Sequence, residues 1–185
     1  MTTQFKNFYQ HWLQKADNYQ NNELKDYFDK FFTLFVIFNF LYMEIWNIRC
    51  NNGLLKKKNF NDRKAATNHV IEYVGARFYI SQLLIENEYR NNFSALTTIK
   101  DEFYIVLDWG KPQLFKDLDL WESLEETNIN KKATAVLALF YNIRCNLFHG
   151  HKDFEEEQKK LLAPINVLLR KTIEIVYNKL NLTAL

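Results

Sequence analysis

The chain of 185 residues is long enough for one domain with one hydrophobic core. It contains four glycines and two prolines, too few for the turns between many short strands, which excludes sandwiches, barrels and propellers. No two glycines lie close together, so Gly-rich phosphate loops are excluded as well. With 24 basic and 22 acidic residues the net charge is +2, and any site for a polyanion has to be local.

The cysteines and the apolar stretches indicate a cytoplasmic protein. Cys50 and Cys145 are far apart and form no Cys-x-x-Cys pair, as is usual in a reducing compartment. The first residues lack the basic and apolar regions of a secretion signal. The most apolar stretch, 31–43, is shorter than the about 20 residues needed to cross a bilayer, so we interpret it as part of a buried helix.

The first half of the chain reads as helices separated by one long loop. Aromatic residues within 5–13 predict a first helix, and phenylalanines at three- and four-residue spacing predict a central core helix over 23–50. Residues 50–62 combine Asn-Asn-Gly with three lysines and predict a loop. Asp62 is expected to cap the helix that follows.

The second half of the chain also reads as helical. Residues 63–90 predict a helix or a pair of helices broken at Gly75, and Asn91-Asn92 predicts a boundary. The elements expected next are a helix at 93–108, a turn at 109–112, a short helix at 114–125 and a helix from 130 to 144.

The last helix is expected to begin at a capping box formed by Asp153 and Glu156. Pro164 is expected to kink or split it. The fold class is therefore all-α, a single domain over 1–185 with about six to eight helices.

The segment from Tyr141 to Gly150 carries the candidate chemistry. Arg144 can hold a phosphate, and His149 can exchange a proton near neutral pH, a pair that suits metal-free cleavage of RNA by its own 2′-hydroxyl. Five helical residues rotate by about 500°, which leaves the two side chains about 140° apart. Either the helix ends between them, with Gly150 in a left-handed cap, or they meet partners from a second chain. Alternatively, Arg144 is an ordinary ion-pairing residue and His149 a helix cap.

Two stretches resemble the HEPN superfamily. The run Ile143–Lys152, with sequence IRCNLFHGHK, is similar to its Arg-x4-6-His signature, here as Arg-x4-His, and Phe38–Tyr42, with sequence FNFLY, is similar to a region of small bacterial members. The resemblance implies a helical bundle that dimerises so that two motifs share one cleft. It also implies a metal-independent endoribonuclease of toxin–antitoxin or anti-phage systems, or a relative that has lost catalysis and binds RNA, nucleotide or a partner protein.

By the same resemblance, Arg144 stabilises the transition state, His149 acts as general base or acid, and Asn146 positions His149 or the substrate. The chain departs from the family in two places. Cys145 follows the arginine where a polar residue is common, and His151 stands where one branch carries a tyrosine.

Basic residues outside the catalytic pair are predicted to bind RNA: Lys56, Lys57, Lys58, His151 and Lys152. The alternative for the three lysines is a solvated face. His149 and His151 lack further suitable ligands nearby, so we expect no metal site and no cofactor. The expected partners are RNA, a second copy of the chain, and an antitoxin or defence complex, with no membrane.

Overall fold

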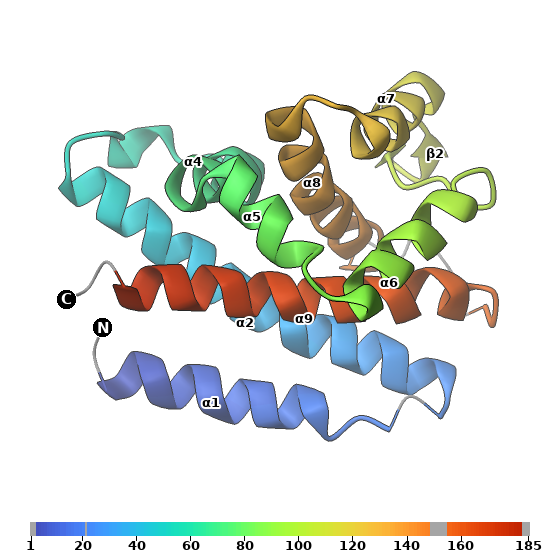
Figure 1. The fold of residues 1–185 in the computed structure, drawn as a ribbon, viewed down its shortest axis with the longest axis horizontal. Helices are drawn as coiled ribbons and strands as arrows, with labels where there is room; N and C mark the ends of the chain where they lie inside the picture. Colours follow the sequence, from blue (N-terminus) through green and yellow to red (C-terminus); the bar gives the residue numbers. More distant parts are fainter. Residues whose placement is uncertain (1–2, 21, 149–154, 183–185) are drawn as a thin grey trace.

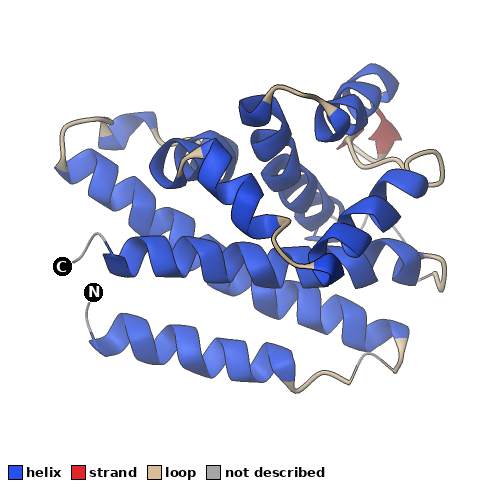
Figure 2. Ribbon diagram, in the orientation of Figure 1, coloured by secondary structure: helices blue, strands red, loops and turns tan. Residues whose placement is uncertain are grey.

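The computed structural model describes residues 3–20, 22–148 and 155–182, and most of this length is helical (Figures 1 and 2). The all-α, single-domain bundle expected from the sequence is confirmed. Its elements are α1 (Thr3–Asp17), α2 (Leu24–Asn51), a 3₁₀ turn (Lys57–Asn59), α3 (Asp62–Lys64), a π-helical turn (Ala65–His69), α4 (Val70–Val74), α5 (Ala76–Leu83), α6 (Asn87–Thr98), β1 (Leu107–Asp108), β2 (Lys111–Pro112), α7 (Leu114–Glu125), α8 (Ile129–Phe148) and α9 (Gln158–Leu182).

The two long helices α2 and α9 pack against each other at the centre of the bundle. Figure 1 shows α1 along one side of this pair, with α5, α6, α7 and α8 on the opposite side. Helix α2 supplies large side chains that are fully buried, because its apolar residues recur at helical spacing. These include Phe31, Leu34, Ile37, Phe38, Leu41 and Ile45.

Helix α2 is long and apolar enough to cross a membrane by length and composition, and 56% of its apolar 18-residue stretch is buried inside the bundle. Its apolar face contacts α1 and α9. A core helix of a globular domain has this same composition, so packing accounts for the hydropathy of α2.

The segment after α2 differs from its prediction at the helix start. The expected loop contains a short 3₁₀ turn, and the following helix is capped by Asn61, whose Oδ1 accepts a hydrogen bond from the Lys64 N–H (2.9 Å). The expectation that Asp62 is the cap is wrong, because its carboxylate binds side chains of two other helices. Gly75 breaks the next helix as expected, with φ of 91°.

The boundaries between 84 and 108 are the main errors of the sequence prediction. The break lies at 84–86, and Asn91 and Asn92 lie inside α6. Helix α6 ends at Thr98, and the chain to 106 is not helical. The Asp117 carboxylate accepts hydrogen bonds from the N–H groups of Ile105 (2.6 Å) and Val106 (2.8 Å). These backbone N–H groups therefore have hydrogen-bond partners without a helix. The helix at 93–108 was predicted from the apolar residues alone, which do not show this contact.

A two-residue turn joins β1 and β2 at the predicted 109–112 position. Trp109 and Gly110 have φ of 49° and 77°, the left-handed conformations that such a hairpin turn requires. A tryptophan pays a steric cost there because of its β-carbon, and Trp109 is 90% exposed, so no burial offsets that strain.

Pro164 was expected to kink or split the last helix, and of these two alternatives the split is wrong because α9 is continuous through Pro164. Pro164 is buried near the start of α9, where it removes one backbone hydrogen bond, and the packing of α9 on α2 holds the helix on both sides. Asp153 lies outside the described residues. Helix α9 begins at Gln158, and the carbonyls of residues 155–157 accept hydrogen bonds from the N–H groups of residues 158–160.

Candidate functional site

The Asp62 carboxylate joins helices α2 and α8. Its Oδ1 accepts a hydrogen bond from the Tyr42 hydroxyl (2.7 Å), and its Oδ2 accepts one from the Tyr141 hydroxyl (3.0 Å). Tyr42 is the last residue of the FNFLY stretch in α2, and Tyr141 lies one helical turn before Arg144 in α8. The fold therefore connects α2 and α8, which are distant in the sequence, through one carboxylate.

Arg144 lies beside this carboxylate. Its Nη1 is 4.0 Å from Asp62 Oδ2, and its guanidinium carbon lies 5.8 Å from the ring centre of Phe35 and 5.9 Å from that of Tyr141. The side chain of Arg144 is 30% exposed. Burial by itself lowers the pKa of Arg144, but Cys145, Asp62 and Tyr141 raise it, and the net shift is upward, so the guanidinium is charged at neutral pH. We call Tyr42, Asp62, Tyr141 and Arg144 the Asp62 cluster.

The tyrosines of the cluster have raised pKa values. Burial raises the pKa of Tyr42 and of Tyr141, and the hydrogen bond to Asp62 raises both further because it requires the protonated hydroxyl. Burial also raises the pKa of Tyr79, and it raises that of Tyr9 to about 12.

These shifts predict a loss of stability at alkaline pH. The unfolded chain releases tyrosine protons near pH 10, whereas the folded chain holds those of Tyr9, Tyr42, Tyr79 and Tyr141 to higher pH. Folding stability is therefore full below about pH 10 and falls as the pH rises above it. Absorbance titration at 295 nm should show these hydroxyls still protonated at about pH 11 in the native protein. Identical titration curves for native and guanidinium-unfolded protein would contradict this.

Asn146 has a structural contact in the described chain. It is 6% exposed, and its Nδ2 donates a hydrogen bond to the Ile105 carbonyl (2.8 Å). Together with Asp117, Asn146 therefore fixes the 103–106 segment between α7 and α8. This contact gives Asn146 a role that the sequence did not predict, and it does not require contact with His149 or with a substrate.

The other predicted site residues divide into two groups. Lys56, Lys57 and Lys58 are exposed in the loop before Asp62, and no carboxylate pairs with them within the described chain. The predicted residues His149, His151 and Lys152 lie outside the described residues. Among the residues that the structure does describe, no group of three or more histidine, cysteine or acidic side chains is arranged to hold a metal.

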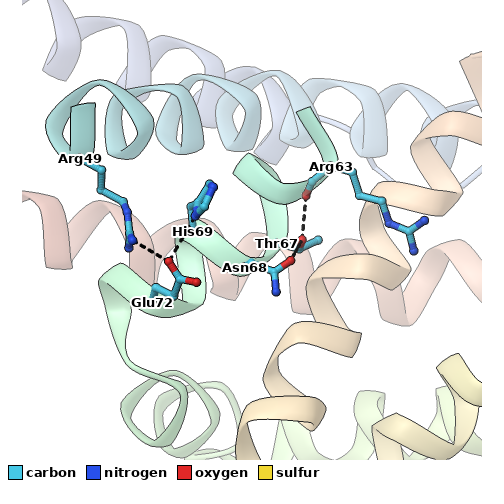
Figure 3. Close-up of polar contacts among 6 residues, drawn as sticks. All are labelled: Arg49, Arg63, Thr67, Asn68, His69 and Glu72. Carbon is cyan, nitrogen blue, oxygen red and sulfur yellow. Dashed lines mark hydrogen bonds and ion pairs between the residues drawn. The ribbon is translucent and has the colours of Figure 1, made fainter. Parts of the chain in front are cut away.

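A second polar cluster, formed by Arg49, His69 and Glu72, lies at the C-terminal end of the π-helical turn (Figure 3). Glu72 Oε2 lies 2.6 Å from Arg49 Nη2 and 3.2 Å from His69 Nδ1. Arg49 is at the end of α2, and Glu72 is in α4. These contacts tie the two helices together, and we assign this cluster to the fold.

Asp62 is the residue that sequence reasoning missed. Its type and position also fit a helix cap, and helical periodicity gives no sign of its contacts with two other helices. One feature of the sequence could have indicated another role for Asp62. Asn61 and Asp62 are adjacent residues that can both cap a helix, and the helix needs only one cap.

Comparisons of the chain with protein-family models, with curated proteins and with solved structures found no match. The fold and the site define an all-α bundle in which a charged arginine lies beside a carboxylate that accepts hydrogen bonds from two tyrosine hydroxyls.

Proposed function

We propose that this protein is a metal-independent HEPN-type endoribonuclease. In this proposal it acts in the cytoplasm as a homodimer, pools Arg144 and His149 of both copies in one cleft, and serves a toxin–antitoxin or anti-phage system. The observation that supports it most is Arg144, a charged and partly exposed side chain in the last two turns of α8, five residues before His149.

The proposed reaction needs only the RNA and these two side chains. The 2′-hydroxyl oxygen attacks the neighbouring phosphorus, and the bond from phosphorus to the 5′-oxygen breaks, which leaves a 2′,3′-cyclic phosphate and a 5′-hydroxyl. In the proposed dimer, His149 of one copy accepts the proton of the 2′-hydroxyl, and His149 of the other copy supplies the proton to the leaving oxygen. Arg144 stabilises the negative charge that grows on the phosphate oxygens.

The proposal is tested with a fluorogenic RNA and purified protein in excess EDTA. Wild type should cleave the RNA, and Arg144→Ala and His149→Ala should not. Matched controls are Arg170→Ala, which removes an arginine paired with Asp17, and His11→Ala, which removes an exposed histidine of α1. Equal cleavage by all five proteins, or by none, would overturn the assignment.

A noncatalytic module that binds RNA, nucleotide or a partner protein is the second candidate. The burial of Asn146 and its bond to the Ile105 carbonyl favour it, because they leave one residue of the expected catalytic set in a packing role. It predicts RNA binding without turnover and binding that survives His149→Ala.

A further inference from the structure

An open groove of about 500 Å³ lies between α7, α8 and the π-helical turn. Ala135 and Ala138 of α8 are nearly buried and form its floor, and their small side chains leave the space above them open. Polar side chains from three separate segments line the groove: Arg63, Asn68, Lys116, Ser123, Lys131 and Thr134.

The lining of this groove is rich in hydrogen-bond donors and positive charge. Among the described lining residues there are three positively charged side chains, Arg63, Lys116 and Lys131, and one carboxylate, Asp119. Lys131 Nζ lies 3.3 Å from Glu126, whereas no carboxylate of the described chain forms an ion pair with Arg63 or Lys116. Phosphate oxygens only accept hydrogen bonds, so a lining of this kind suits a polyanionic backbone.

The π-helical turn forms one wall of the groove. The Thr67 hydroxyl donates a hydrogen bond to the Arg63 carbonyl (2.7 Å) and lies 3.1 Å from Asn68 Oδ1. Arg63 lies in α3, directly before this turn, and Figure 3 shows its side chain extending toward α8. Turns of this type are rare and occur often at functional sites.

The groove adjoins the Asp62 cluster in two ways. Arg63 follows Asp62 directly in the chain. On α8, Thr134 and Ala138 of the groove are continued by Tyr141 and Cys145 at steps of three and four residues, which place all four on one face of the helix. A polymer lying in the groove would therefore be directed toward the end of α8 that carries Arg144.

We propose that this groove binds single-stranded RNA and guides it to Arg144. The inference rests on the proposed function and names the form of its substrate. Its volume of about 500 Å³ lies within the range of about 300–1000 Å³ of pockets that hold small ligands. It has room for a short part of one strand and not for the width of a duplex.

The test measures binding of a fluorescein-labelled, 2′-O-methyl single-stranded oligonucleotide, which the proposed reaction cannot cleave, by anisotropy over a range of salt concentrations. Each phosphate contact contributes a slope of about −0.7 to log K against log salt for a single strand. Arg63→Gln combined with Lys116→Gln should make the negative slope shallower by about 1.4 and weaken binding about 25-fold at 0.1 M salt. An unlabelled duplex of equal length should compete poorly.

The matched control is Lys6→Gln combined with Lys25→Gln, which removes two exposed positive charges from α1 and the start of α2, far from α7 in Figure 1. Circular dichroism melting should show both double variants folded. Equal binding by both variants, or equal competition by the duplex, overturns the groove proposal while cleavage in EDTA still supports the nuclease. Groove-dependent binding without cleavage overturns only the nuclease, and absence of binding by wild type overturns the groove proposal.

Discussion

Replacing Arg144 with alanine is expected to lower the rate of RNA cleavage by about 100- to 1000-fold, the usual effect of removing one donor that stabilises transition-state charge. The structure predicts only a small loss of stability, because the ion pair with Asp62 is 4.0 Å long and both side chains are about one-third exposed. Partly exposed pairs of this kind contribute about 0–1 kcal/mol. Activity and stability should therefore separate in this variant.

Two further variants sharpen this prediction. Arg144→Lys keeps the charge but loses the planar fork of donors, so its cleavage rate should lie between those of wild type and Arg144→Ala. Arg170→Ala should leave the rate unchanged, since Arg170 is paired with Asp17 on α1. The measurement is single-turnover cleavage together with a urea unfolding curve. A stability loss of several kcal/mol with full activity in the remaining folded protein would show that Arg144 is structural.

The second large effect is expected from Asp62→Ala. This change removes the acceptor of the Tyr42 and Tyr141 hydroxyls. Tyr42 is 1% exposed, and leaving a buried hydroxyl without its partner costs about 1–3 kcal/mol. Tyr141 is half-buried and should contribute less. Urea unfolding should show a total loss of about 2–4 kcal/mol.

The control for this prediction is Asp17→Ala, which removes an exposed carboxylate paired with Arg170 and should cost at most about 1 kcal/mol. A double-mutant cycle with Tyr42→Phe identifies the contact, because the combined loss should be smaller than the sum of the single losses when both changes remove the same hydrogen bond. Strict additivity would contradict the geometry described for Asp62.

The same change should also alter the tyrosine titration. Without the Asp62 carboxylate, the pKa of Tyr42 and of Tyr141 should fall, while burial continues to hold them above the ordinary value. The pKa of Tyr79 should not change, because burial raises it and its hydroxyl lies 2.8 Å from Thr172 in the core and not beside Asp62.

How far the sequence predicted the fold can be judged from particular segments. The short helix 114–125 was predicted with the bounds of α7, because its buried residues Leu120, Trp121 and Leu124 follow helical spacing. The non-helical 99–106 segment was predicted as helix because it contains several apolar residues. Its backbone N–H groups instead bind a carboxylate of α7, which lies elsewhere in the sequence. Local pattern carries no information about that partner.

The candidate site divides in the same way. Arg144 could be singled out because it stands in a short run with several functional groups, whereas Asp62 and the groove residues Arg63, Lys116 and Lys131 come from separate segments. None of these segments has a pattern that points to the others.

The sequence by itself determined the all-α class and the long core helices, because amphipathic spacing and the scarcity of glycine and proline act within single segments. Only the tertiary structure decided that a carboxylate before α3 joins tyrosines of α2 and α8 beside Arg144. The physical reason is that side-chain hydrogen bonds and grooves depend on how helices pack, and helix packing joins residues that are remote along the chain.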